Sequence, residues 1–333
     1  MRYLLILAFA AGCSQNNGTG MPGPEDMAVP SPDIATVPLD LAGAKRMHFV
    51  MDHVLMPDSS SEATKYLYDV DGTGPKRNKM VAVLDALKIA GGAPLQETVD
   101  SALLAGTLIQ LLLVEAIDTS IMNDDGMRVQ GFAGVEPMGQ SPATNFSGSA
   151  AFDLDLSEQP AQHWLNAAAT SGKVTTLHLP YGSFPIHFPL QGIAPLAMTV
   201  YGAHVSFVTT ARTSNGMTTL SLSSGVLNGG LSNQQVQDRL VPAVAMMLQQ
   251  IVDAGPNTMN AMTVLMQFDK NKDGKVSADE VRNHPIVSSI LEPDCDLFDG
   301  SGNLAPNTDK MLDSISFGVG FTAVGAQFTE PVN

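Results

Sequence analysis

The chain has 333 residues, of which 44% are hydrophobic and 15% are charged, a balance typical of a folded globular protein rather than a disordered or coiled-coil chain. Asp and Glu number 33 against 17 Lys and Arg, which gives a formal net charge of −16. Nucleic-acid binding needs a basic surface that displaces counterions, so this charge argues against a nucleic-acid partner and is compatible with cations.

The N-terminal stretch MRYLLILAFAAGC has the features of an export signal. An arginine is followed by an apolar run, Tyr3 to Ala11, that is short for a membrane span and typical of a secretion signal. The ending Gly12-Cys13 resembles a bacterial lipobox, so we expect a signal peptide at 1–13 and lipidation at Cys13. Ser14 follows the cysteine, which in lipoproteins of Gram-negative bacteria implies sorting to the outer membrane. An ordinary signal peptide that is cleaved elsewhere is the alternative.

Residues 14–45 are predicted to form a disordered tether between the lipid anchor and the folded part. The stretch SQNNGTGMPGPEDMAVPSPDIATVPLDL is rich in Gly, Pro, Ser and acidic residues and cannot bury enough apolar surface to fold. Cys295 is the only other cysteine, and it has no intrachain partner if Cys13 is acylated. An exported chain of this kind needs cross-links other than a disulfide, such as metal ions.

Apolar periodicity predicts helices and strands along the rest of the chain. In chain order, we predict a strand at 47–56, helices at 78–90 and 95–105, a buried strand at 107–117, a strand at 149–156, a helix at 159–170, two strands within 173–190, strands at 198–211 and 216–230 joined by a turn at 213–216, a helix at 234–253 and a final strand at 317–328. Pro242 lies in the first half of the helix at 234–253, where it favours a kink. Short turns between the strands imply an antiparallel sheet.

The stretch FDKNKDGKVSADEV, Phe268 to Val281, matches the loop of an EF-hand calcium site. That loop places oxygen ligands at positions 1, 3, 5, 7, 9 and 12, with a glycine at position 6 for a sharp turn. Gly274 is at position 6, and the predicted ligands are Asp269, Asn271, Asp273, the backbone carbonyl of Lys275, Ser277 and Glu280. The stretch before the loop places Met259, Met262, Leu265 and Met266 on one helix face. Ca²⁺ is therefore the predicted cofactor, and a polar helix-turn-helix without a metal is the alternative.

The segment YDVDGTGPKRN, Tyr68 to Asn78, repeats part of this pattern. Asp69, Asp71 and Thr73 have the spacing of positions 1, 3 and 5, and Gly74 follows, but no acid stands at position 12. A metal site and an Asx-type turn before a helix remain open alternatives.

The segment EPDCDLFDGSGNLAPNTDKMLDS, Glu292 to Ser314, is predicted to hold a second calcium ion, since acids at this density repel one another without a cation. Its candidate ligands are Asp294, Asp296, Asp299, Ser301, Asn303 and Asp309. EF-hands normally occur in pairs, so this segment could lie beside the first loop. Cys295 stands between two acids, which raises the pKa of its thiol and disfavours a nucleophilic role.

The sequence contains no HExxH, GxSxG or GxxxxGK[ST] motif, so no enzyme is predicted. His178, His187 and His204 fall in predicted strands, where packed histidines are commoner than a zinc site. Asp153 and Asp155 share one strand face, and paired carboxylates can serve glycoside hydrolysis. A hydrolase that uses this pair is an alternative, although surface acids at strand ends are commoner.

The order of these segments resembles a group of predicted lipoproteins of Gram-negative bacteria. Those proteins carry a DLDGDGxxDN-type segment near the start and a PDVDL…DSLSxGxGFTAV-type ending. The resemblance rests on Asp69, Asp71, Gly72 and Asn78, and on Pro293, Asp294, Asp296, Asp313, Ser314, Ser316, Gly318, Gly320 and Phe321. Thr73 and Arg77 stand where the group has acids. The resemblance implies an envelope location and calcium binding, and it implies no reaction.

The sequence as a whole predicts an α+β fold, with an antiparallel β-rich core (an open sheet, a sandwich or a partial barrel), flanking helices and one EF-hand. We assign 46–255 to the β-rich core, 256–291 to the EF-hand and 292–333 to an Asp-rich loop and a C-terminal strand that packs on the core. The predicted function is that of a calcium-binding, lipid-anchored lipoprotein of the cell envelope, in which calcium is structural. A calcium sensor or interaction module with a Met-rich groove is the alternative, and the sequence identifies neither a protein nor a glycan partner.

Overall fold

The structure is a computed structural model that describes residues 41–57, 62, 64–83, 95–155, 164–177, 181–214 and 217–330. These residues belong to one compact unit that begins at Leu39. The predicted signal peptide with Cys13, most of the predicted tether, the later part of the predicted helix at 78–90, and His178 lie outside the described residues.

Ten strands form one sheet. They are β1 (Lys45–Leu55), β2 (Ile109–Ala116), β3 (Asn123–Val135), β4 (Ala150–Leu154), β5 (Leu165–Thr170), β6 (Lys173–Thr176), β7 (Ser183–Phe188), β8 (Leu196–Ser214), β9 (Met217–Ser232) and β10 (Ser314–Phe328). The helical elements are the 3₁₀ turns η1 (Thr64–Tyr66) and η2 (Pro142–Thr144), the helices α3 (Leu95–Leu104) and α4 (Asn233–Gln235), the π-helical turn η3 (Val236–Leu240), and the helices α5 (Val241–Ala254), α6 (Met259–Phe268), α7 (Ala278–Arg282) and α8 (Pro285–Ile290).

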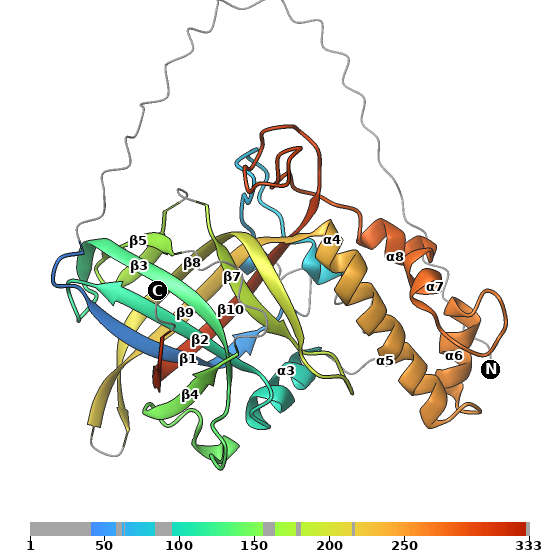
Figure 1. The fold of residues 1–333 in the computed structure, drawn as a ribbon, viewed down its shortest axis with the longest axis horizontal. Helices are drawn as coiled ribbons and strands as arrows, with labels where there is room; N and C mark the ends of the chain where they lie inside the picture. The colour runs from blue at the N-terminus through green and yellow to red at the C-terminus, as the bar shows by residue number, and fades with distance from the viewer. Residues whose placement is uncertain are drawn as a thin grey trace, which may run out of the picture. The chain divides into compact units, whose positions relative to one another are not determined.

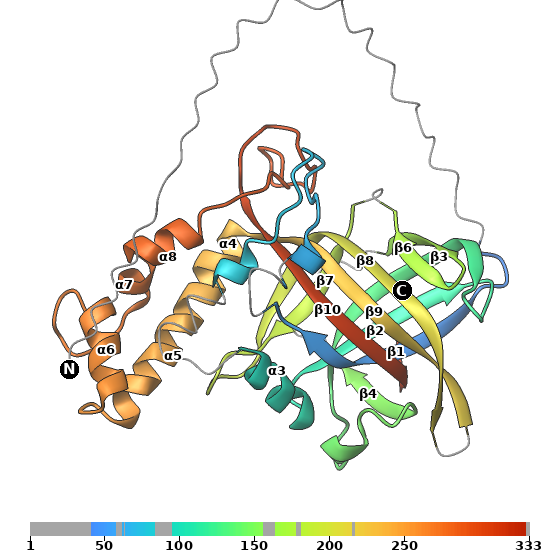
Figure 2. The same cartoon turned by 180° about the vertical axis from the view of Figure 1, so that it is seen from behind.

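The sheet closes on itself. β1 pairs with β2, the pairing continues through β3, β5, β6, β8, β9 and β10, and β10 pairs with β1 again. Every pairing in this circuit is antiparallel. β7 adds to β8, and β4 lies between β3 and β10, parallel to β10. The predicted β-rich, mainly antiparallel α+β fold is confirmed, and a closed circuit of strands replaces the open sheet or sandwich (Figures 1 and 2).

Apolar side chains are buried on both faces of β2, which explains its unbroken apolar sequence. Successive side chains of a strand point to opposite faces of a sheet. Leu112 and Val114 belong to the main core, whereas Leu111 and Leu113 belong to a second, smaller core that also contains Phe132. All eight residues of β2 are buried as a result.

Helices α5 to α8 gather at one side of the sheet and share the main core with it (Figures 1 and 2). Leu248 of α5, Phe268 of α6 and Val281 of α7 belong to the same buried cluster as Phe207 and Phe317 of the strands. α5 contacts both α6 and α7. Among the helices that the structure describes, none is long and apolar enough to cross a membrane.

The predicted helix at 159–170 is wrong within its described part. Leu165–Thr170 is strand β5, which pairs with β3 and β6. An alanine-rich sequence favours a helix by intrinsic propensity. Leu165, Ala167 and Ala169 are nevertheless buried at alternate positions, which is the period of a strand with one covered face.

Two further local features differ from the sequence prediction. The sequence prediction does not include β3; in the structure the register between β3 and β5 shifts between Asp124 and Met127. The predicted helix at 234–253 is divided by the π-helical turn η3, and Pro242 lies in the first turn of α5 directly after it. Proline removes one intrahelical hydrogen bond, so it suits a position directly after a turn that already interrupts the α-helical pattern.

Candidate functional site

The predicted calcium loop connects α6 to α7, and we call residues 269–280 the Asp269 loop. Lys272 and Gly274 have positive φ angles, 62° and 78°. A β-carbon on Gly274 would meet no atom within 4 Å, so backbone conformation rather than space favours glycine there. Thr258 caps α6 and Ser277 caps α7, each through a hydrogen bond from a backbone N–H to its side chain. Ser277 thus fixes the end of the loop that enters α7.

The oxygens at the start of the Asp269 loop face its own backbone. Asp269 accepts hydrogen bonds from the N–H groups of Asp273 at 3.1 Å and Gly274 at 2.9 Å. Asn271 Oδ1 also accepts from the N–H of Asp273, at 2.9 Å. Asp273 Oδ1 accepts from the N–H of Lys275 at 2.9 Å. The chain is therefore wound around its oxygen-bearing side chains.

Glu280 joins the two ends of the loop. Its Oε1 accepts from the N–H groups of Lys270 at 3.0 Å and Asn271 at 3.3 Å, and its Oε2 accepts from the N–H and the hydroxyl of Ser277 at 3.0 and 2.8 Å. Ser277 Oγ accepts from the N–H of Glu280 in return, which completes a capping box at the start of α7. Burial raises the pKa of Glu280, but the hydrogen bonds from Ser277, Asn271 and Lys270 favour the ionised form and hold the pKa below its ordinary value.

Gln249 bonds the Asp269 loop to α5. Its Oε1 accepts from the N–H of Val276 at 2.7 Å, and its Nε2 donates to Asp253 Oδ1 at 2.7 Å. Val276 is itself buried. The segment 294–309, for which a place beside this loop was one option, forms hydrogen bonds with Asp71 and Arg77 near the other end of the described chain.

The donor set of the Asp269 loop consists of oxygen alone and so fits a hard cation such as Ca²⁺. In the part of the chain that the structure describes, no three Asp, Glu, His or Cys side chains lie close enough together to hold a metal by themselves. The side chains of Asn271 and Ser277 and the carbonyl of Lys275 would therefore have to complete the coordination. This mixed donor set is the one that the EF-hand pattern predicts.

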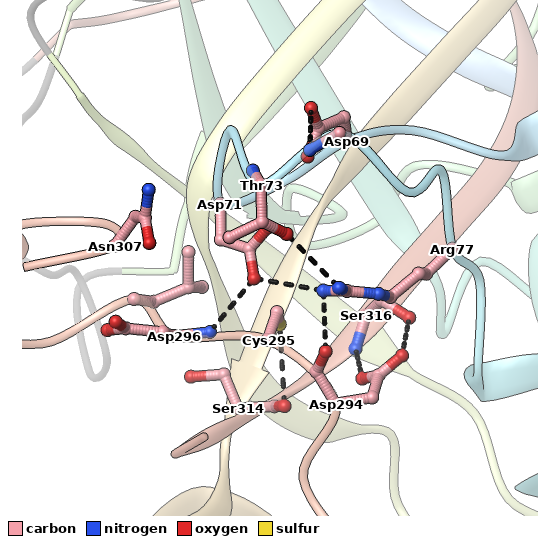
Figure 3. Close-up of polar contacts among 12 residues, drawn as sticks. Asp69, Asp71, Thr73, Arg77, Asp294, Cys295, Asp296, Asn307, Ser314 and Ser316 are labelled. Carbon is pink, nitrogen blue, oxygen red and sulfur yellow. Dashed lines mark hydrogen bonds and ion pairs between the residues drawn. The ribbon is translucent and has the colours of Figure 1, made fainter. Parts of the chain in front are cut away.

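Two acidic segments from opposite ends of the described chain pack against each other (Figure 3). We call the set of Asp71, Arg77, Asp294, Asp296 and Asp313 the Asp junction. The N–H of Asp296 donates to Asp71 Oδ2 at 3.2 Å. Arg77 Nη1 donates to Asp71 Oδ2 at 2.9 Å and to the carbonyl oxygen of Asp294 at 2.7 Å. One guanidinium thus bridges the two segments.

Arg77 supplies positive charge where the first acidic segment could otherwise bind a metal. The side chain of Asp71 is 1% exposed and that of Arg77 is 27% exposed. Burial raises the pKa of Asp71, but hydrogen bonds from Thr73, from the N–H of Asp296 and from Arg77 hold the pKa below its ordinary value. Asp71 Oδ1 also accepts from the N–H and the hydroxyl of Thr73, at 3.2 and 2.7 Å. These contacts favour the Asx-type turn over a metal site.

Asp294 and Asp313 hold backbone groups in place. Asp294 accepts from the N–H of Ser316 at 2.7 Å and from its hydroxyl at 2.6 Å. Asp313 accepts from the N–H groups of Leu297 at 3.1 Å and Phe298 at 2.8 Å. Both oxygens of Asp294 are engaged, so this candidate metal ligand has a structural role in the geometry observed.

The other candidate ligands of the predicted second site lie further along the same loop. Asp299 Oδ1 accepts from the N–H groups of Ser301 and Asn303, both at 2.9 Å, and these residues form a compact turn. Asp309 is exposed. Asp296 is only 2% exposed, and its Oδ1 is buried without a hydrogen-bond partner. The predicted set is thus dispersed, and Asp296 is its most unusual member.

Strand β10 approaches the first acidic segment closely at two glycines. A β-carbon on Gly318 would lie 2.3 Å from the carbonyl oxygen of Tyr66, and one on Gly320 would lie 2.5 Å from the Tyr66 hydroxyl. Asn78 Nδ2 donates to the carbonyl oxygen of Gly318 at 2.8 Å. The two motifs that carry the family resemblance are therefore parts of one contact. Sequence reasoning missed this contact, and Arg77 and Asp313 as members of it, although both lie inside the quoted segments.

Cys295 is buried within the Asp junction. Burial and the charges of Asp294, Asp71 and Asp313 raise the pKa of its thiol, and Arg77 lowers it by less. This direction agrees with the expectation from sequence, and an un-ionised, buried thiol is a poor nucleophile.

The residues considered for a hydrolase or a zinc site do not gather around a shared pocket. Asp153 is exposed, and Asp155 Oδ2 lies 3.5 Å from His187 Nε2. Neither acid lines the cavity around Leu248 and Phe268 or the cavity around Glu97 and Gln191. His204 stacks on Tyr68, with ring centroids 4.3 Å apart, and belongs to another part of the sheet than His187. The described histidines therefore form no shared zinc site.

Comparison of the chain with models of protein families, with curated proteins and with solved structures finds no match. No family is therefore assigned, and the resemblance stated above stays a prediction.

Proposed function

We propose that the protein is a calcium-binding, lipid-anchored protein of the cell envelope in which calcium stabilises the fold. The Asp269 loop is the EF-hand that binds the ion, through Asp269, Asn271, Asp273, the carbonyl of Lys275, Ser277 and Glu280. The observation that carries this proposal is the return of Glu280 to the N–H groups of Lys270 and Asn271. It brings the last acid of the loop back to the first turn, which the coordination of one ion requires.

Calcium stabilises the fold through this loop by two effects. Asp269, Asp273 and Glu280 lie within one short loop, and a divalent cation offsets the repulsion among them. The loop also joins α6 to α7, so an ion that fixes it also fixes the packing of Phe268 and Val281 in the main core. An ion that binds only the folded state raises the free energy of unfolding.

Calcium is expected to raise the Tm without exposing apolar surface. The purified full chain is melted in Ca²⁺ and in EDTA, and a dye that fluoresces on apolar surface reports exposure in the same samples. A higher Tm with unchanged fluorescence supports structural calcium. An unchanged Tm contradicts it.

A calcium sensor is the second candidate, because one face of α6 carries exposed methionines. Met259, Met262 and Met266 are 79%, 54% and 81% exposed, whereas Val264 and Phe268 of the same helix are buried in the main core. Exposed apolar side chains of this kind suit a partner-binding surface. Dye fluorescence that rises with calcium favours the sensor over the structural role.

The proposed lipid anchor has a direct test at the N-terminus. Cys13→Ser removes the acylated thiol and is expected to move the protein from the membrane fraction to the soluble fraction, because the acyl chains provide the binding energy. Ser14→Ala is the matched control and stays with the membrane. Fractionation followed by immunoblotting measures both, and a Cys13→Ser protein that stays in the membrane fraction contradicts the anchor.

A further inference from the structure

Asp296 is the carboxylate of the Asp junction that the described contacts leave incomplete. Its Oδ2 accepts from the N–H of Lys310 at 2.9 Å, but its Oδ1 is buried and has no hydrogen-bond partner. The residue is 2% exposed, so water reaches this oxygen poorly. A buried carboxylate oxygen without a hydrogen-bond partner has lost its solvation by water without compensation, which is unfavourable for the folded state. Such an oxygen points to a missing ligand.

The charges around Asp296 are also unbalanced. The Asp junction contains four carboxylates and one guanidinium, and Arg77 is committed to Asp71 and to the carbonyl of Asp294 (Figure 3). The ammonium of Lys310, the nearest lysine in sequence, donates instead to the carbonyl oxygen of Asn307 at 3.1 Å. No described cation is therefore seen to bind Asp296.

Asp309 is the acid that the backbone brings next to Asp296. It immediately precedes Lys310, whose N–H donates to Asp296 Oδ2 at 2.9 Å. Asp313 and Asp71 are engaged with backbone N–H groups and with Arg77. Asp309 is exposed, and one of its oxygens accepts from the N–H of Met311 at 2.9 Å.

We propose that the Asp junction binds a second calcium ion, separate from that of the Asp269 loop, through Asp296 Oδ1 and the carboxylate of Asp309. The donors are carboxylate oxygens on an irregular loop, where backbone carbonyls and water can complete the shell; such a set suits Ca²⁺ rather than zinc or copper. Both ligands belong to the second acidic segment, so the ion fixes the loop whose Asp296 N–H donates to Asp71 of the first segment. Asp294 and Asp299, which the sequence pattern also suggests, keep their structural hydrogen bonds.

Calcium bound per chain tests this site, measured by equilibrium dialysis on the purified full chain. Glu280→Gln removes the ion of the Asp269 loop and is expected to leave one ion bound. Adding Asp296→Asn or Asp309→Asn to Glu280→Gln is expected to weaken binding of the remaining ion by at least tenfold. Glu292→Gln is the matched control, since it removes an exposed acid of the same segment that lies outside the proposed pair.

The outcomes separate the two metal sites. A loss of the remaining ion with Asp296→Asn or Asp309→Asn, and not with Glu292→Gln, supports the proposal. Glu280→Gln alone abolishing all calcium binding overturns it, and so does full binding in the Asp296→Asn double variant. If that variant does not fold by circular dichroism, Asp309→Asn at its exposed position decides, and full binding there overturns the site. If the Glu280→Gln protein loses no ion, calcium binding by the Asp269 loop is contradicted. The Asp296→Asn and Asp309→Asn variants then still decide whether the Asp junction binds calcium.

Discussion

Glu280→Gln is expected to abolish the rise in Tm that calcium produces through the Asp269 loop. Glutamine keeps the length of the side chain and can still complete the capping box with Ser277, so α7 keeps its start. What is lost is the charge and the second carboxylate oxygen, which an EF-hand uses to bind calcium in bidentate fashion. The Tm in EDTA is therefore expected to stay close to that of the unchanged protein.

The size of the effect follows from linkage. At a calcium concentration 100 times Kd, one bound ion contributes about 2.7 kcal/mol to the free energy of unfolding. For a domain of this size that is a rise in Tm of roughly 4–5 °C. A Kd of about 10⁻⁴–10⁻³ M is sufficient where calcium is plentiful.

Asp279→Asn is the matched control for Glu280→Gln. Asp279 is the adjacent acid on α7, and its exposed side chain pairs with Arg282 instead of turning into the loop. The full rise in Tm is expected to remain in this variant. Differential scanning calorimetry in Ca²⁺ and in EDTA measures both proteins. A Glu280→Gln protein whose Tm rises with calcium by as much as that of the unchanged protein would show that Glu280 is not a ligand of the Asp269 loop.

Arg77→Met is expected to destabilise the protein by about 2–4 kcal/mol, because it leaves the buried carboxylate of Asp71 without its cation. The lower part of the range for a buried ion pair applies, since Arg77 itself is 27% exposed. Methionine keeps the apolar stem of the side chain, so the lost free energy is that of the charge and its hydrogen bonds to Asp71 and to the carbonyl of Asp294. Urea denaturation measures the change.

Lys76→Met tests whether the destabilisation by Arg77→Met depends on the position of the lost charge or follows from the loss of any positive charge in this segment. Lys76 is exposed and adjacent in sequence, so its replacement is expected to change the free energy of unfolding by less than about 0.5 kcal/mol. Adding Asp71→Asn to Arg77→Met is expected to recover part of the loss, because the unpaired charge is removed. If Arg77→Met and Lys76→Met are equally stable, Arg77 is not the cation that holds the junction.

The Asp269 loop could be predicted from sequence because its contacts are local. Glu280 bonds Lys270 and Asn271, all within one loop, so the spacing of oxygen-bearing residues already contains the geometry. The Asp junction has the opposite character. Asp71 and Asp296 are 225 positions apart, and nothing in the spacing of either segment shows that one completes the other. In the sequence, the two segments are connected only because both contribute to the resemblance to the group of predicted lipoproteins. Their contact is seen only in the structure.

The strands show the same limit. Alternation predicts which side chains of a strand share a face, but it does not identify the neighbouring strand. The sequence predicts two strands within 173–190, and the structure pairs each of them, β6 and β7, with β8. For β5, the alanine content favours a helix, whereas the alternation of Leu165, Ala167 and Ala169 favours a strand. The strand forms because it buries these three side chains in the main core.

The closure of the sheet makes the last strand decisive for how the chain folds. β10 pairs with both β9 and β1, and Phe49 of β1 lies opposite Gly325 of β10. Until Ser314–Phe328 has been synthesised, β9 and β1 each lack the neighbour that the finished sheet gives them, and an unpaired strand edge can join another chain. Contacts between residues so far apart in sequence also form slowly. A nascent or truncated chain that stops before β10 is thus prone to aggregation and proteolysis. A chaperone that binds the unpaired edges of β1 and β9 would protect the chain until β10 has been made.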